Sequence, residues 1–91
     1  MQKYDLICRY DSRKSFYGKA KTFLEDNKLK LQSYNTIVAE KDMNRKNGNI
    51  VFRCFGKYSQ TTTRHQKEFF KQLGLTDKQI KEVFDKGELE V

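Results

Sequence analysis

Residues 59–87 read SQTTTRHQKEFFKQLGLTDKQIKEVFDKG, and this stretch decides the fold. Its hydroxyl-rich start is typical of a helix N-terminus, because Ser and Thr side chains accept hydrogen bonds from the first free backbone N–H groups. Phe69, Phe70 and Leu73 follow at helical spacing, which predicts a helix over about residues 61–73. Gly74 is well suited to end that helix, since it adopts a left-handed backbone without strain.

A second helix is predicted directly afterwards, over about residues 77–86. Thr76 and Gln79 form the capping-box pattern, in which each side chain binds the other residue's backbone N–H. Gly87 marks the end of this helix. An apolar stripe is expected from Ile80, Val83 and Phe84.

Before residue 59 the pattern changes from helical spacing to alternation, which indicates strands. The runs from 3 to 10, 16 to 24, 28 to 33, 34 to 40 and 50 to 55 alternate or are rich in β-branched residues, and turn-forming residues separate most of them. We therefore predict an α+β fold in a single domain, 1–91. Its antiparallel sheet has three to five strands, over about residues 3–56, and the two short C-terminal helices cover one face.

The net charge of +7 is unevenly distributed. Residues 1–63 hold 13 basic and 6 acidic side chains, whereas residues 64–91 hold 6 of each. A positive field of this kind favours nucleic acid, an acidic protein face or an anionic surface as partner. A merely solvated surface is the alternative that charge alone leaves open.

Several classes of protein lack their sequence signals here. No apolar run approaches the roughly 20 residues of a membrane span, and the N-terminus does not resemble a signal peptide, so we expect a protein of the host-cell cytosol and no membrane partner. Cys8 and Cys54 are expected to be buried thiols. One histidine and no C-x-x-C pair predict no metal site. We also expect no cofactor, because the chain has no glycine-rich nucleotide-binding loop.

The first candidate surface is the hairpin predicted from the runs on either side of residues 25–27. We expect one of its faces to carry four lysines, which are Lys19, Lys21, Lys28 and Lys30. The flanking turns add four more basic residues, which are Arg13, Lys14, Arg45 and Lys46. These cations would meet phosphates, and Tyr17 would stack on a base. A lysine-rich strand face is at least as often only a solvated, aggregation-resistant edge.

The second candidate surface is the start of the first predicted helix. Hydroxyl side chains there are accompanied by Lys57, Arg64 and His65. The unpaired N–H groups of a helix N-terminus, together with these cations, would suit a phosphate or a carboxylate. The alternative is ordinary capping, with His65 packed on the sheet. Neither surface has a base and nucleophile at a readable spacing, so we predict no catalytic residue and no enzyme.

Three ordered blocks carry a family resemblance: DSRKSFYGKA from residue 11, SYNTIVA from residue 33 and YSQTTTRHQKEF from residue 58. They are similar to a family of small proteins from phages and mobile elements of Gram-positive bacteria, which has no established activity. The resemblance implies a setting in which small proteins often bind and disable host machinery. The resulting hypothesis is a binding protein that acts on a host or phage nucleoprotein complex, for example as an anti-CRISPR or other anti-defence inhibitor. The alternative is an accessory protein that binds DNA or RNA directly through the basic hairpin face.

Overall fold

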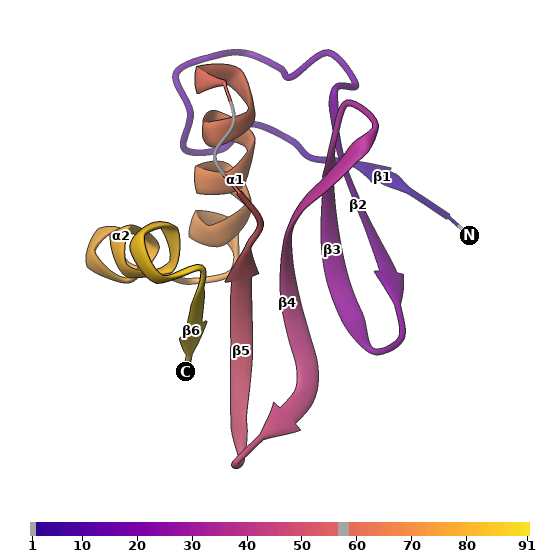
Figure 1. Ribbon diagram of the computed structural model, residues 1–91. Helices are drawn as coiled ribbons and strands as arrows, with labels where there is room; N and C mark the ends of the chain where they lie inside the picture. The colour runs from indigo at the N-terminus through magenta and orange to yellow at the C-terminus, as the bar shows by residue number, and fades with distance from the viewer. Residues whose placement is uncertain (1, 57–58) are drawn as a thin grey trace.

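The computed structural model describes residues 2–56 and 59–91, and within these ranges the chain forms six strands and two helices (Figure 1). Each strand pairs antiparallel with the next along the chain, in the order β1-β2-β3-β4-β5-β6. The N-terminal strands are β1 (Tyr4–Asp5), β2 (Ala20–Glu25) and β3 (Lys28–Ser33). The remaining elements are β4 (Thr36–Lys46), β5 (Asn49–Cys54), α1 (Gln60–Gln72), α2 (Asp77–Lys86) and β6 (Glu88–Glu90).

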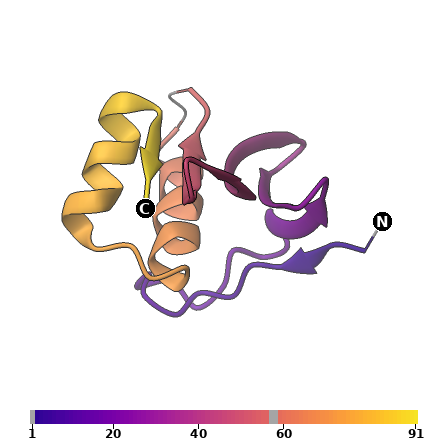
Figure 2. The ribbon, with the colours of Figure 1, turned by 90° about the horizontal axis from the view of Figure 1, so that it is seen from below.

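The α+β class and the antiparallel sheet are confirmed, but the expected three to five strands were too few. The missed strand, β6, has three residues and follows Gly87, whose positive φ of 84° turns the chain back along β5. Three residues carry too little alternation to be recognised. Figure 2 shows that β6 and α2 lie at one edge of the sheet, while the N-terminus lies beside β1 at the other.

Both helices begin and end close to the predicted positions. Ser59 caps α1 by accepting the N–H of Thr62, and the full capping box of Thr76 and Gln79 starts α2. Helix α1 contacts β3 and β4, and α2 contacts β5 and β6. Their apolar stripes therefore share one core with the sheet.

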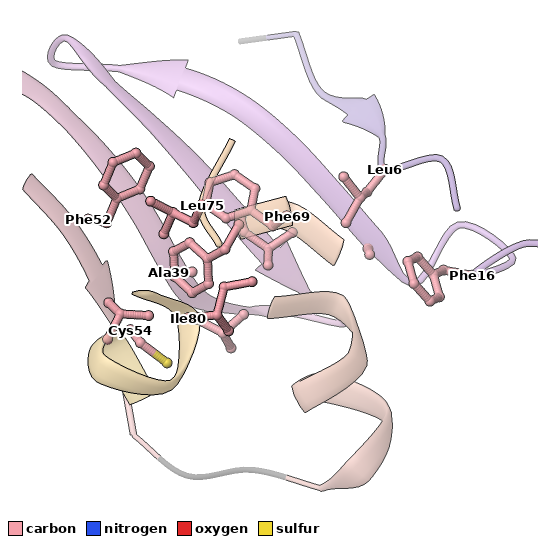
Figure 3. Close-up of a cluster of buried hydrophobic side chains, with 13 residues drawn as sticks. Leu6, Phe16, Ala39, Phe52, Cys54, Phe69, Leu75 and Ile80 are labelled. Atoms are coloured by element: carbon pink, nitrogen blue, oxygen red, sulfur yellow. The ribbon is translucent and has the colours of Figure 1, made fainter. Parts of the chain in front are cut away.

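The core joins side chains from nearly every part of the chain (Figure 3). Leu31, Ala39 and Cys54 are cross-strand neighbours on the sheet and are almost completely buried. Phe69 and Ile80 of the helices pack into the same cluster. Figure 3 shows Leu6 and Phe16 at one end of it, where the long segment between β1 and β2 meets the sheet.

The predicted strand over residues 3–10 is wrong beyond Asp5. Leu6 is buried, but Tyr4 and Tyr10, which would lie on the same face of such a strand, are mostly exposed. Residues 6–19 instead form a loop, which Figure 1 shows passing around α1 and over its N-terminal end. The reason lies in α1, where the buried carboxylate of Glu68 accepts hydrogen bonds from backbone N–H groups of residues 9–11, which a strand would have used for pairing.

Candidate functional site

Glu68 of α1 is the side chain that holds this loop. It is 2% exposed, and its Oε1 accepts the backbone N–H groups of Arg9, Tyr10 and Asp11 at 3.0, 2.8 and 2.9 Å. Oε2 accepts the side-chain N–H of Gln72 at 2.8 Å. Burial alone would raise the pKa of Glu68, but these four hydrogen bonds outweigh it and lower the pKa. An ionised carboxylate therefore fixes residues 9–11 to the helix.

The rest of the loop is held by the packing of Phe16, by an ion pair and by a local hydrogen bond. Phe16 is buried, and its ring meets the edge of His65 with the ring centroids 4.5 Å apart. The Asp11 carboxylate lies 3.6 Å from Arg64 Nη1 and also accepts the N–H of Arg13 at 2.9 Å. Because both ends are held, the intervening side chains are presented from a defined backbone.

A tight turn at the end of the loop exposes one aromatic ring. The Lys19 N–H donates to the Phe16 carbonyl at 2.9 Å, and Tyr17 and Gly18 between them have φ of 52° and 73°. Positive φ at both central positions is the pattern of a type I′ turn. Gly18 adopts it freely, but a tyrosine does so at a cost. The strained residue is also the most exposed aromatic in the described chain, at 76%.

The turn between β3 and β4 lies against this one. The Tyr34 N–H donates to the Lys19 carbonyl at 2.7 Å, and the Lys19 ammonium lies 6.0 Å from the centroid of the Tyr34 ring. Tyr34 also has a positive φ, of 55°. We define the loop surface as five exposed side chains, which are Arg13, Lys14, Tyr17, Lys19 and Tyr34.

His65 lies beneath the loop surface and is only 1% exposed. Its Nδ1 is 2.8 Å from the Ser33 hydroxyl, which in turn lies 3.0 Å from the Thr62 hydroxyl. Burial lowers the pKa of His65, so the ring is neutral near pH 7. Nε2 has no hydrogen-bond partner among the described residues. The ring packs against Phe16 and supports the loop without reaching solvent.

The predicted hairpin face has a different character. Lys21, Lys28 and Lys30 do share one face of β2 and β3, but Lys19 precedes β2 and belongs to the loop surface. The ammonium groups of Lys21 and Lys30 each lie 2.9 Å from a carboxylate, of Asp5 and Glu25 respectively. This face is therefore largely charge-compensated, because most of its cations are paired within the protein.

The same face continues onto β4 and β5 as an ion-paired cluster. Arg53 Nη1 lies 2.6 Å from Glu40 and 2.7 Å from Asp42, and both carboxylates are buried. The Arg53 hydrogen bond lowers the pKa of Asp42 against the opposing effect of burial. Three ionised groups here satisfy one another, which leaves little charge for an external ligand.

The remaining predicted residues lie elsewhere. Arg45 and Lys46, predicted to lie in a turn, are instead the last two residues of β4, at the opposite end of the sheet from the loop surface (Figure 1). Arg45 donates to the Gly48 carbonyl at 3.0 Å, and Lys46 lies 3.9 and 3.8 Å from Glu88 and Glu90. The predicted residue Lys57 lies outside the described residues. The structure thus groups Arg13, Lys14, Tyr17 and Lys19, with Arg64 next to them.

Two participants escaped the sequence analysis. Tyr34 joins the loop surface only because β3 and β4 bring their connecting turn against the loop. In the sequence, Glu68 is not distinguishable from the other charged residues of the helix. No local pattern predicts that its carboxylate accepts hydrogen bonds from the backbone of residues 9–11. Within residues 2–56 and 59–91, no three His, Cys, Asp or Glu side chains are grouped to hold a metal ion. In that same part of the chain, no helix has the length and apolar character to cross a membrane.

Fold and site together define a small α+β protein that presents a cationic, aromatic loop from a helix-anchored backbone. Comparison with known families goes one step further: a family model matches residues 4–86, and the chain belongs to that family, described as a family of unknown function (DUF8033). No curated protein and no solved structure matches the chain.

Proposed function

We propose that this protein is a non-enzymatic binding protein whose loop surface contacts an exposed single-stranded nucleic-acid segment of a nucleoprotein complex. The observation that carries the proposal is Tyr17, a ring held 76% exposed by a strained turn between cationic neighbours. Because Tyr17 is 76% exposed, its side chain buries little apolar area in the folded protein. Strained residues that persist in a defined backbone are concentrated at binding sites.

The chemistry of the loop surface suits a flexible polyanion. Arg13, Lys14 and Lys19 supply three cations, and none forms a salt bridge with a described carboxylate. Single-strand-binding proteins combine such cations with aromatic rings on which bases stack. Tyr17 and Tyr34 offer two rings beside those cations, so phosphates and bases would both find partners.

The resemblance to phage and mobile-element proteins suggests which complexes to test. Host defence depends on nucleoprotein complexes, among them CRISPR nucleases, and a small binding protein without a catalytic site would act on them by occupying a surface. The basic hairpin face is the weaker second candidate for nucleic-acid contact, since Lys21 and Lys30 are already paired with carboxylates.

The test is fluorescence anisotropy with labelled oligothymidylate and oligouridylate. Tyr17→Asn removes the ring and replaces it with a residue that tolerates positive φ, so the turn should persist. Loss of one stacked base costs about 1–3 kcal/mol, which is about 5- to 150-fold in Kd. With three phosphate contacts, affinity should fall about 20-fold between about 50 and about 200 mM salt.

Matched variants distinguish binding through the loop surface from a general effect of net charge. Arg13→Glu with Lys14→Glu should abolish binding, whereas Lys78→Glu with Lys86→Glu on α2 changes the net charge equally and should reduce binding far less. Affinity purification from expressing cells, with and without nuclease, then identifies the complex. The proposal fails if neither oligonucleotide binds at low salt and no nuclease-sensitive complex is recovered. Loss of binding in Lys21→Gln with Lys30→Gln alone would transfer the function to the hairpin face.

A further inference from the structure

A groove between α1 and α2 is separate from the loop surface and has a different lining. Ile80 and Phe84 of α2 form its apolar floor, and Lys67 and Lys71 of α1 with Lys81 of α2 stand on its rim. Ile80 is buried and Phe84 half-buried, with the Phe84 ring centroid 6.2 Å from that of Phe70 in the core. The groove has a volume of about 400 Å³.

The rim carries an excess of positive charge that the protein does not neutralise. Asp77 is the one carboxylate lining the groove, and it lies 2.7 Å from the Lys71 ammonium. Lys67 and Lys81 form no salt bridge with any described residue. Lys67 also stands four residues before Lys71 on the same face of α1, where like charges repel each other. A ligand with carboxylates would relieve that repulsion.

We infer that this groove binds an acidic, amphipathic helical segment of a partner protein. A helix binds in such a groove by placing its own apolar side chains, at positions i, i+3 or i+4, against an apolar floor. Ile80 and Phe84 provide that floor. Carboxylates flanking that stripe would meet Lys67, Lys71 and Lys81. The charge complementarity and the apolar floor together favour a peptide, because a phosphate backbone would match the lysines but would leave the floor uncovered.

The groove and the loop surface share no residue, but both depend on α1, which supplies Lys67 and Lys71 to the groove and anchors the loop through Glu68. Lys67 also lines a second depression, together with Gln60, Thr63 and Arg64, which leads toward the N-terminal end of α1. One nucleoprotein complex would therefore be able to offer a protein segment to the groove and a nucleic-acid strand to the loop. The groove inference does not require the loop proposal, since no residue of the loop surface lines the groove.

The experiment uses the full chain and a fluorescein-labelled helical peptide. Its Leu and Phe residues repeat every three or four positions, and the other positions are mostly Glu and Asp. A scrambled peptide of the same composition is the ligand control. The groove variant is Lys67→Glu with Lys81→Glu, and the matched control is Lys78→Glu with Lys86→Glu, which changes the charge equally on exposed positions outside the groove.

We expect the ordered peptide to bind, the scrambled peptide to bind at least about tenfold more weakly, and the groove variant to lose more than about tenfold in affinity. The control variant should lose less than about threefold. Backbone amide shifts in NMR spectra should change around Ile80 and Phe84, and Arg13→Glu with Lys14→Glu should bind the peptide as the wild type does. Circular dichroism checks that each variant is folded.

Three results would overturn the inference. Equal binding of both peptides would show attraction by charge alone, and equal losses in the two lysine variants would show that the groove has no special role. Displacement of the peptide by oligothymidylate, with both ligands lost in the groove variant, would make the groove a nucleic-acid contact. The first two results do not depend on the oligonucleotide experiment on the loop surface.

Discussion

Replacing Glu68 by Gln removes the negative charge that fixes the N-terminal loop to α1 while keeping the size of the side chain. The amide oxygen would still face the N–H groups of Arg9, Tyr10 and Asp11, but without charge. The new NH₂ group would face the Gln72 side-chain amide nitrogen, which now donates to Glu68 Oε2. Three hydrogen bonds are thus weakened and a fourth becomes a contact between two donors.

The expected loss follows from the number of bonds. A hydrogen bond to a charged group contributes about 1.5–3 kcal/mol and a neutral one about 0.5–1.5 kcal/mol, so each of the three bonds loses about 1 kcal/mol. Because bonds to one atom are not independent, we expect the free energy of unfolding to fall by about 2–3 kcal/mol. With the usual urea dependence for small proteins, the unfolding midpoint falls by about 1 M or more.

Two measurements test this reasoning, urea unfolding and amide hydrogen exchange. Exchange of the amides of residues 9–11 should accelerate in the variant because their acceptor is weakened, while amides in β4 and β5 should respond only to the global change in stability. Glu82→Gln in α2 is the control, since that carboxylate forms no salt bridge among the described residues.

The same variant has a pH signature with a defined sign. The pKa of Glu68 is lower in the folded protein than its ordinary value of 4.5, so the carboxylate stabilises the fold above that value. This stability is lost as pH falls from 4.5 through the folded pKa, and Glu68→Gln should lose less stability over that range. A change below about 0.5 kcal/mol, with unaltered exchange of residues 9–11, would refute the anchoring role.

Three further predictions concern the core and the helices. Burial lowers the pKa of His65 in the folded protein below 6.5, so stability should decrease as pH falls from 6.5 through the folded pKa. In His65→Gln, the melting temperature measured over the same pH range should no longer show this decrease. Burial raises the pKa of Cys54 to about 11, so at about pH 8 alkylation followed by mass spectrometry should modify half-buried Cys8 first; equal rates would contradict the buried position. Thr76→Ala should lower the unfolding free energy by about 1 kcal/mol through loss of the capping box, and an unchanged urea midpoint would argue against it.

Local signals were strong enough to predict much of the fold. The capping box at Thr76, the glycines after each helix and the spacing of Phe69 and Phe70 place α1 and α2 within one residue of the observed bounds. The turn at residues 25–27 was also predicted, and Asp26 and Asn27 adopt the positive φ that such residues tolerate. These features depend on neighbours in the chain, which a sequence displays directly.

The candidate site was predicted only in part, because its arrangement depends on contacts between distant residues. The sequence placed Arg13 and Lys14 in a polar turn, but it predicted a strand from residue 16, with Lys19 among the hairpin lysines, whereas β2 begins only at Ala20 and Tyr17 lies in the loop. Pairing is invisible in a linear count, so the neutralisation of Lys21 and Lys30 by carboxylates could not be anticipated.

The sequence by itself determined the helices, the tight turns and the overall positive charge, since each arises from residue type and short spacing. Only the tertiary structure decided where the charge is available and why residues 6–19 are a loop. The physical reason is that the carboxylate of Glu68, 57 to 59 residues away along the chain, accepts three backbone N–H groups that would otherwise need a partner in a neighbouring strand.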